Sequence, residues 1–331
     1  MSRNKGKREK EKKSRHIGRK IFIIILILLA IGGGIFAKKV YDLGGDIPAV
    51  IAALLGHNKK TVEELDKIYI LAMGESTGMS DTMIVCSYDP KTQEASMLSI
   101  PRDTYVGTNK NKANAYDKLN AQYSNGTTPE KTIEKINEIT GLDIKYYVLV
   151  DTKALKELVD LIGGIDFDVP DNMNYDDDSQ NLHIHLKKGL QHLDGDKVEQ
   201  VVRFRHNNDG TSYSYKYGDN DYGRMRTQRA VITTVLEKAK SSMNVKRITE
   251  ILELTKKYVQ TNMDLSILKD YIPYVLQMNT ESMQSEQLPG ESKKINGIWF
   301  FLHDEEKTKE TIDRLFLKTN VEENNNSVNE I

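Results

Sequence analysis

Arginine residues are few in this 331-residue chain, and most of those beyond the N-terminus lie close together. Eight arginines fall between positions 21 and 331; one is Arg102, and five others form a short run: Arg203, Arg205, Arg224, Arg226 and Arg229. Lysine supplies nearly all the other positive charge. A planar guanidinium binds phosphate or carboxylate groups through two parallel hydrogen bonds. The pattern predicts a site that binds an anion. The alternative is that the arginines form surface ion pairs, and for Arg226 and Arg229 taken singly a structural role is at least as good an interpretation.

Acidic residues lie near these arginines or at the start of a neighbouring strand: Asp81, Asp103, Asp219 and Asp221. Carboxylates mixed with arginines suit a Mg²⁺–diphosphate site, because the metal bridges phosphate oxygens while arginines neutralise the remaining charge. The sequence has no glycine-rich nucleotide loop, no serine nucleophile elbow and no His-Glu-x-x-His motif. Phosphoryl transfer needs mainly positioning and charge neutralisation, so it is compatible with the lack of a protein nucleophile.

The segments that must position these side chains alternate between strand and helix patterns. Apolar or alternating runs predict strands at 68–73, 82–88, 94–100, 146–150, 165–169, 182–186 and 294–302. Helical periodicity, with Pro129 at one start and Gly141 at the corresponding stop, predicts helices at 129–140, 152–162, 194–202, 222–240, 247–257, 265–278 and 308–317. The expected fold is α/β, with a mixed central β-sheet flanked by helices.

The net charge of −1 hides a strong asymmetry. Residues 1–20 contain ten basic and two acidic side chains, a net charge of +8, which leaves −9 on the remainder. Residues 21–37 carry no charge, and 17 residues reach the roughly 17–25 that a spanning helix needs. A cleaved signal peptide would have a shorter apolar region and an Ala-x-Ala-like site, and neither is present. The basic flank places the N-terminus in the cytoplasm.

The expected organisation is therefore a basic cytoplasmic tail (1–20), a transmembrane helix (21–37), an extracellular stalk (38–66), an extracellular catalytic domain (67–317) and a disordered tail (318–331). The basic tail suits contact with anionic membrane lipid, and no nucleic acid is expected as a partner because so short a tail holds no recognition fold.

Other candidate groups favour structural interpretations. The single cysteine, Cys86, excludes an internal disulfide and is expected as a buried, inert thiol on a strand. His183 and His185 have a spacing that zinc can use, although exposed strand histidines are favoured. The acidic run 176–178 is expected in a solvated loop rather than at a calcium site.

Several motifs occur in the order found in the LytR-CpsA-Psr family, and residues of about 66–240 resemble that family. The motifs are Ser80-Asp-Thr-Met83, Ser99-Ile-Pro-Arg-Asp-Thr104, Lys118-Leu-Asn120, Gly163-Gly-Ile-Asp-Phe-Asp-Val-Pro170, Gly189-Leu-Gln-His-Leu-Asp-Gly195, Arg203-Phe-Arg-His206 and Asp221-Tyr-Gly-Arg-Met-Arg-Thr-Gln228. The resemblance implies an α-β-α domain with an apolar pocket for a lipid tail and a Mg²⁺–arginine mouth.

The resemblance also implies a function. Such proteins are phosphotransferases that move a glycopolymer (teichoic acid or a capsule-like polysaccharide) from a polyprenyl-diphosphate carrier to a peptidoglycan hydroxyl, releasing polyprenyl monophosphate. The implied location is the cell membrane of a Gram-positive type bacterium, in single-pass form, with the catalytic domain outside.

Carried over by position, the resemblance implies a diphosphate-binding set: Arg102, Lys118, Arg203, Arg205, Arg224 and Gln228. It implies Mg²⁺, or Mn²⁺ in its place, at Asp81 and Glu75. It implies a catalytic role for Asp103, together with Arg102 and Asp221.

One stretch departs from the family. Relatives place an acidic ligand in a Gly-x-Asp setting and an arginine just before Ser-Asp-Thr, whereas this chain reads Met73-Gly-Glu-Ser-Thr-Gly-Met79. Ser76 occupies the position nearest to the acidic ligand, Glu75 or Ser76 is expected to serve in its place, and Met79 stands where the arginine would be. This departure leaves one alternative function, a non-catalytic surface protein that binds lipid-linked diphosphate or anionic polymer.

Overall fold

The computed structural model describes residues 35, 37–56, 60–76, 79–123 and 128–317. The chain forms two compact units that divide between Thr61 and Val62. The expected basic tail, nearly all of the expected span at 21–37 and the C-terminal tail lie outside the described residues. Within the described ranges, no helix has the length and apolar character needed to cross a membrane. In the first unit, α2 (Ile47–Leu54) begins after Asp46, whose side chain accepts from the Ala49 amide at 2.8 Å.

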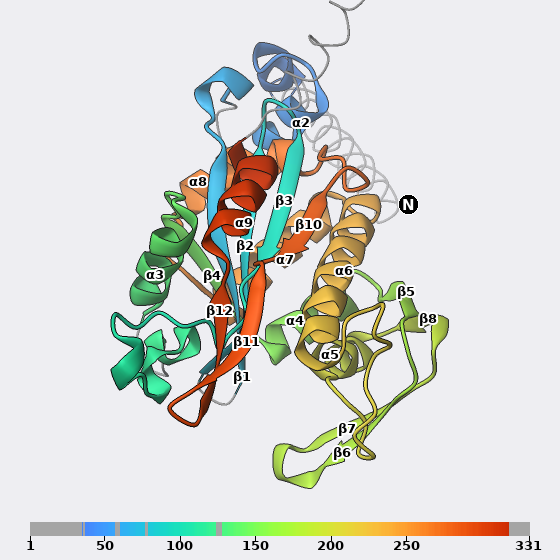
Figure 1. The fold of residues 1–331 in the computed structure, drawn as a ribbon. Coiled ribbons are helices and arrows are strands. Elements are labelled where there is room, and N and C mark those ends of the chain that lie inside the picture. Colours follow the sequence, from blue (N-terminus) through green and yellow to red (C-terminus); the bar gives the residue numbers. More distant parts are fainter. Residues whose placement is uncertain (1–34, 36, 57–59, 77–78, 124–127, 318–331) are drawn as a thin grey trace, which may run out of the picture. The chain divides into compact units, whose positions relative to one another are not determined.

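A six-stranded mixed sheet forms the centre of the second unit, as the sequence predicts (Figure 1). Its order is β10-β3-β2-β1-β4-β9. The strands are β1 (Ile68–Ser76), β2 (Met79–Asp89), β3 (Glu94–Ser99), β4 (Tyr146–Asp151), β9 (Val259–Thr261) and β10 (Gln284–Gln287). β1 pairs antiparallel with β2 and parallel with β4, so the ends of β1 and β4 meet at the same edge of the sheet.

Side-chain alternation along β1 explains why both faces of this sheet are covered. Leu71 and Met73 are buried in a cluster with residues of α3 (Glu130–Thr140), of α9 (Glu305–Ile312) and of the π-helical turn Asp313–Leu317. Ile68 and Ile70 pack on the opposite side, with residues of α8 (Leu265–Val275). α7 (Val245–Tyr258) leads directly into β9.

A second apolar cluster packs beside the sheet. It joins α4 (Thr152–Leu161), α5 (Gly195–Arg203) and the long α6 (Asn220–Ser241) to two hairpin-like sheets, β5 (Ile165–Val169) with β8 (Gly189–Leu193) and β6 (Met173–Asp177) with β7 (Leu182–Leu186). The start of α6 lies tightly against the preceding loop. A Cβ added at Gly223 would lie 2.2 Å from the Gly218 carbonyl oxygen and 2.2 Å from the Tyr213 ring.

Two predictions of local structure are wrong. The run 294–302 is not a single strand, because β11 (Gly290–Ile295) and β12 (Ile298–His303) form a hairpin. Asn296 and Gly297 make the turn with φ of 50° and 83°, the left-handed conformation that Asn-Gly hairpins use. Asp176 and Asp177 belong to β6 rather than to a loop, because they pair in register with β7.

Candidate functional site

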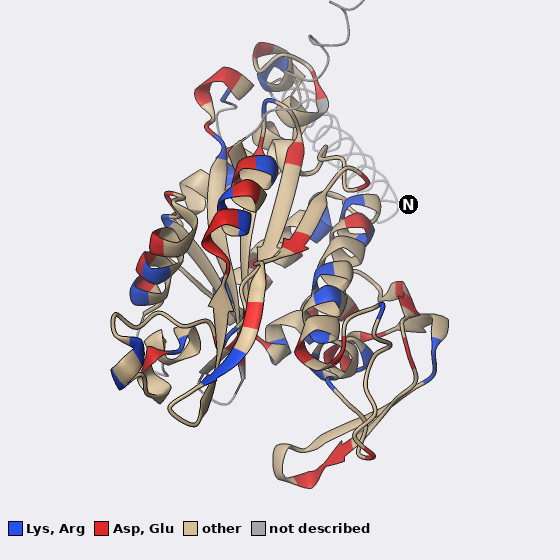
Figure 2. Cartoon of the chain, viewed as in Figure 1, with Lys and Arg blue, Asp and Glu red and all other residues tan. Residues whose placement is uncertain are grey.

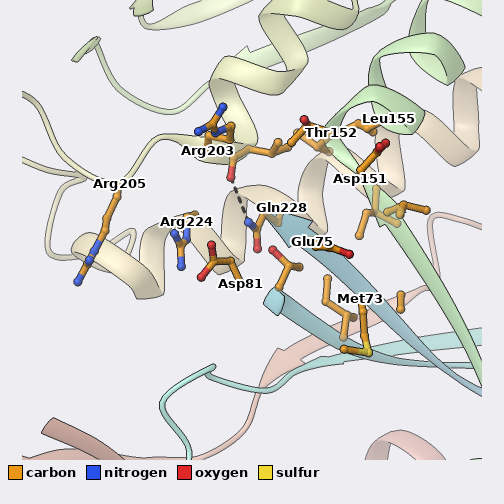
Figure 3. A pocket seen from close by; sticks show the side chains of 18 of the residues that line it. Met73, Glu75, Asp81, Asp151, Thr152, Leu155, Arg203, Arg205, Arg224 and Gln228 are labelled. Atoms are coloured by element: carbon orange, nitrogen blue, oxygen red, sulfur yellow. Dashed lines mark hydrogen bonds between the residues drawn. The ribbon is translucent and has the colours of Figure 1, made fainter. Parts of the chain in front are cut away.

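A cavity of about 500 Å³ opens at the ends of β1 and β2 (Figure 3). Its inner part is apolar because two helices turn one stripe toward it: Leu155 and Leu158 on α4, and Val231, Ile232, Val235 and Leu236 on α6. Three- and four-residue spacing brings such side chains to one face of a helix. Its outer part is lined by charged and polar residues: Glu75, Asp81, Arg102, Arg203, Arg205, Arg224 and Gln228. The cavity therefore joins an apolar interior to a charged mouth.

Three arginines at this mouth surround Asp221. Arg205 Nε and Arg224 Nη2 each lie 3.1 Å from Asp221 Oδ1, and Arg102 Nε lies 3.9 Å from Asp221 Oδ2. Arg102 also donates to Asp81. Arg102 comes from the loop after β3, Arg205 from the segment after α5, and Arg224 from the second turn of α6. Within this cluster three guanidinium groups face two carboxylates, Asp81 and Asp221, and such a local excess of positive charge favours an anionic ligand.

The electrostatics of this cluster match that interpretation. Desolvation lowers the pKa of the Arg224 guanidinium, and the nearby charges of Arg102 and Arg205 lower it further, against the effect of Asp221. At Arg102 the carboxylates outweigh desolvation and raise the pKa. The Nε atoms of Arg102 and Arg224 are buried and lack a hydrogen-bond partner among the described residues. An unmade hydrogen bond of a buried donor costs free energy, and phosphate oxygens would satisfy it.

The remaining members of the diphosphate set are more dispersed. Arg203 lines the cavity, and its guanidinium donates to Glu199 Oε1 and to Gln180 Oε1, both at 3.1 Å. Gln228 is buried, and its amide donates to the Val202 carbonyl at 3.0 Å (Figure 3).

Arg226 and Arg229 take structural positions. Arg226 lies 5.3 Å from the centre of the Tyr217 ring. Arg229 is buried and donates to Ser99 Oγ at 2.8 Å, and desolvation lowers its pKa to about 10. Neither is among the residues that line the cavity.

Asp103 and Lys118 lie beside the mouth rather than in the cavity lining. Lys118 Nζ donates to Asp103 Oδ1 at 2.8 Å, and the side chain of Asp103 is 34% exposed. Asp103 therefore holds a lysine and, unlike Asp221, forms no ion pair with a guanidinium group in the part of the chain that the structure describes. Its charge still acts on Arg102, whose pKa it helps to raise.

Glu75 and Asp81 are the two expected metal ligands, and both line the cavity. Glu75 Oε2 accepts from Tyr123 at 2.8 Å, and the pKa of Tyr123 rises to about 12 through desolvation and this bond. Asp151 also lines the cavity, because it is the register partner of Glu75 across the parallel β1–β4 pairing. The sequence patterns did not point to this residue. One oxygen of Asp151 caps α4 at the Ala154 amide, 2.7 Å away.

The donor chemistry suits Mg²⁺, which typically binds one or two carboxylates together with water and substrate phosphates. Within the described residues no group of three or more His, Cys, Asp or Glu side chains is arranged to hold a metal by itself. Glu75 and Asp81 place two carboxylates in the same cavity lining as the arginines, so the donor set would fit an ion whose remaining ligands come from water and a substrate. Ser76 is the last residue of β1.

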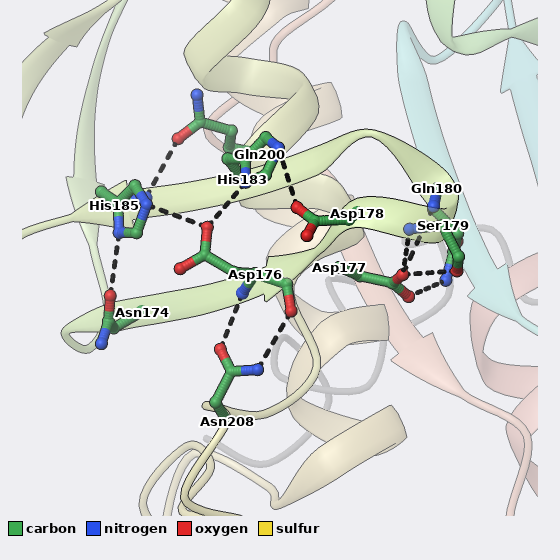
Figure 4. Close-up of polar contacts among 10 residues, drawn as sticks. All are labelled: Asn174, Asp176, Asp177, Asp178, Ser179, Gln180, His183, His185, Gln200 and Asn208. Atoms are coloured by element: carbon green, nitrogen blue, oxygen red, sulfur yellow. Dashed lines mark hydrogen bonds and ion pairs between the residues drawn. The ribbon is translucent and has the colours of Figure 1, made fainter.

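The histidine pair on β7 has hydrogen-bond partners of its own (Figure 4). His183 Nδ1 and His185 Nε2 lie 2.7 and 3.1 Å from Asp176 Oδ1, and these contacts lower the pKa of Asp176, although desolvation opposes them. Both histidine side chains are about half exposed. They are the exposed strand histidines that the sequence favours. Cys86 lies on β2 as expected, but it is partly exposed rather than buried; desolvation still raises the pKa of its thiol to about 12.

Known proteins resemble the chain over most of its length. It is 30% identical over 266 residues to the polyisoprenyl-teichoic acid–peptidoglycan teichoic acid transferase TagV of Bacillus subtilis, an alignment that covers 76% of this chain and 66% of TagV, just under two thirds of that relative. It is 29% identical over 306 residues to biofilm regulatory protein A of Streptococcus mutans, covering 85% of this chain and 72% of that protein.

Solved structures share the fold. The crystal structure of B. subtilis TagV matches with a TM-score of 0.61 and 27% identity, over 77% of this chain and 98% of that one. The structure of TagT bound to LIIa-WTA matches with a TM-score of 0.58 and 22% identity, over 78% of this chain and 92% of that one. The model of the LytR_cpsA_psr family matches residues 49–316. The ordered motifs, the mixed sheet and the match to the family model all agree. The chain therefore belongs to the LytR_cpsA_psr family.

Proposed function

We propose that this chain is a phosphotransferase that moves a glycopolymer from a polyprenyl-diphosphate carrier to a hydroxyl of peptidoglycan and releases polyprenyl monophosphate. The observation that carries the proposal is the cavity itself, in which an apolar interior opens at a mouth of three arginines. A polyprenyl diphosphate has the same two parts in the same order, because an apolar chain is followed by an anionic diphosphate group. The names of TagV and of the TagT complex support a lipid-linked wall polymer as the substrate class.

The apolar stripes of α4 and α6 would receive the polyprenyl chain, because burial removes its surface from water. Arg102, Arg205 and Arg224 would bind the diphosphate and neutralise the charge that develops in the transition state. The acceptor oxygen would form a bond to the sugar-side phosphorus, and the bond from that phosphorus to the bridging oxygen would break. The bridging oxygen would leave on the polyprenyl monophosphate.

The proton of the acceptor hydroxyl needs a base. Asp221 contacts two guanidinium groups at 3.1 Å and holds the arginines in place. Among the described residues the Asp103 carboxylate pairs with Lys118; it is more exposed than Asp221 and adjoins Arg102 in the sequence. We therefore assign proton acceptance to Asp103 and positioning of the arginines to Asp221. Glu75 and Asp81 would hold Mg²⁺, or Mn²⁺, which when bound supplies further charge neutralisation at the phosphate oxygens.

A coupled assay with the full-length chain in nonionic detergent tests this function. A polyprenyl-diphosphate glycan, a peptidoglycan fragment as acceptor and Mg²⁺ are expected to yield polyprenyl monophosphate and a phosphodiester-linked product in equal amounts, measured by mass spectrometry. Saturable donor binding without either product, with Mg²⁺ or with Mn²⁺, would support the non-catalytic binding function instead.

We also propose that residues 21–37 anchor the chain in the cell membrane with the cavity outside, because ten basic residues precede this uncharged run. A peptide tag placed after Ile331 is expected to be removed by an impermeant protease added to intact cells. A tag that is cleaved only after lysis would contradict this orientation.

A further inference from the structure

A second cavity, of about 680 Å³, lies beside the first, and we call it the α4–α5 groove. It is lined by one face of α4, one face of α5 and residues 180–183, which lead from the turn after β6 into β7. Its polar residues recur at positions 153, 156, 157 and 160 of α4 and at positions 196, 199, 200 and 203 of α5, the spacing that brings side chains to one face of a helix. Leu155 and Leu158 lie on the other face of α4 and line the first cavity, so this helix separates an apolar cavity from a polar one.

The groove shares a wall with the charged mouth. Four residues line both cavities: Thr152, Gln180, Leu182 and Arg203. The Arg203 guanidinium donates to Glu199 Oε1 and to Gln180 Oε1, and both of these acceptors belong to residues of the groove lining. A ligand in the groove can therefore reach the wall of the mouth without entering the apolar cavity.

Contacts within the protein fix the walls of the groove. Gly195, the first residue of α5, lies tightly against α4, since a Cβ added to it would lie 2.5 Å from the Lys156 carbonyl oxygen. Its amide also donates to Asp160 Oδ1 at 2.8 Å. At the turn after β6, the Gln180 side-chain amide donates to Asp177 Oδ2 at 2.6 Å (Figure 4). A preformed groove binds a ligand without a large free-energy cost for ordering its walls.

The charges in the groove are mixed, in contrast to the excess of arginine in the mouth. Three basic and four acidic side chains line it. Lys156 Nζ lies 2.5 Å from Asp196 Oδ1 and 3.3 Å from Glu199 Oε2. Figure 2 shows blue and red together in the region of α4 and α5. A lining of nearly zero net charge gives no advantage to a polyanion, whereas a ligand that carries both an amine and carboxylates can pair with both signs of charge.

We propose that the α4–α5 groove is a subsite for the peptide part of the acceptor, so that the chain selects a glycan that carries a peptide over a bare glycan. This inference rests on the proposed function, in which the acceptor supplies a hydroxyl to a phosphate in the mouth. Peptidoglycan peptides that contain lysine or diaminopimelate carry a free amine as well as carboxylates, the same mixture of charges as the groove.

The exposed residues of the lining assign the contacts. Glu157 and Asp196 would receive the ammonium group of the peptide, and Lys153 would receive a carboxylate. The sugar would then extend across the shared wall, past Arg203, to the mouth. Choice of the acceptor would thus be made by side chains outside the arginine cluster that surrounds Asp221.

The test measures binding of the acceptor alone, by isothermal titration calorimetry of the full-length chain in nonionic detergent without any donor. The probe is a soluble disaccharide–pentapeptide whose third residue is lysine, and the reference is the same disaccharide without the peptide. We expect saturable binding of the probe and an affinity at least about tenfold lower for the reference. The variant E157Q/D196N, which keeps the size of both side chains, should bind the probe about tenfold more weakly than the unmodified chain. Acetylating the lysine amine of the probe should abolish this difference between the two proteins.

A matched control, D143N/E253Q, removes the charge of two exposed acidic residues that pair with lysines and lie outside the lining of both cavities. It should bind the probe like the unmodified chain, and thermal unfolding checks that both variants are folded. Arg205→Ala, which alters the proposed diphosphate site, should also leave binding of the probe unchanged. No saturable binding of the probe, equal affinity for probe and reference, unchanged affinity in E157Q/D196N, equal weakening in D143N/E253Q, or a larger loss in Arg205→Ala than in E157Q/D196N would each overturn the peptide subsite.

Turnover separates this inference from the proposed function. Transfer to bare and peptide-bearing glycans with equal kcat/KM, together with binding that does not depend on the groove, removes the subsite alone. Groove-dependent binding of the probe without transfer from any donor removes the transferase function alone.

Discussion

Replacing Arg224 with alanine is expected to lower kcat/KM for the lipid-linked donor by about 10²–10³-fold, the loss seen when one donor to a transition-state oxyanion is removed. Its side chain is only 12% exposed, lies 3.1 Å from Asp221 and has a buried Nε without a partner among the described residues. The guanidinium is therefore fixed in position before the substrate arrives. Arg224→Lys should restore charge but little activity, because an ammonium cannot reproduce the bidentate geometry.

Arg226→Ala supplies the matched control, since Arg226 lies on the same helix but contacts Tyr217 and is outside the cavity lining. It should retain nearly full turnover. Arg205→Ala should resemble Arg224→Ala, while Arg203→Ala, whose partners are Glu199 and Gln180, should raise KM more than it lowers kcat. Near-normal turnover in both Arg224→Ala and Arg205→Ala would exclude the proposed diphosphate site.

Filling the apolar interior should abolish the use of long-chain donors. Ile232 lines the cavity from α6, and an indole at this position would occupy much of the space that receives the lipid. Ile232→Trp is expected to reduce turnover of a polyprenyl donor at least about tenfold, since each excluded methylene forfeits about 0.8 kcal/mol of burial. A donor with a short, water-soluble tail should be affected far less. Turnover of the two donors by one protein preparation measures this difference.

Glu237→Trp places the same indole at an exposed position of α6 outside the lining of this cavity, and should leave the turnover of both donors unaffected. Thermal unfolding of the two variants shows whether either protein is misfolded, because overpacking typically costs 1–3 kcal/mol. If a folded Ile232→Trp variant processes the long donor at the normal rate, the lipid does not enter this cavity.

Much of the scaffold follows from local sequence patterns. The helix expected at 222–240 is α6, and the helical spacing of Val231, Ile232 and Val235 forms the apolar face that lines the cavity. Helical spacing also explains why only one of the three arginines on α6, Arg224, lines the cavity. At 100° per residue, position 226 lies about 200° from position 224, and position 229 lies about 140° from it, so Arg224 cannot share a face with either of the other two. Asp221 and Arg224, three residues apart, do share one.

Long-range pairing explains what the sequence did not predict. Asp151 joins Glu75 only because β4 pairs in parallel with β1, a contact between residues far apart in the chain. Arg102 reaches Asp221 through tertiary packing alone. The β11–β12 turn did carry a local signal, Asn296-Gly297, but the apolar run after it dominated the pattern and was interpreted as one continuous strand.

The most direct test of the central claim follows the sugar-side phosphate of the donor. With this phosphate labelled by ³²P, the full-length chain, a peptidoglycan acceptor and Mg²⁺ should move the label to the acceptor and release unlabelled polyprenyl monophosphate in equal amount. Label that stays on the lipid, or donor that binds tightly and is never converted, would contradict transfer between the two phosphates.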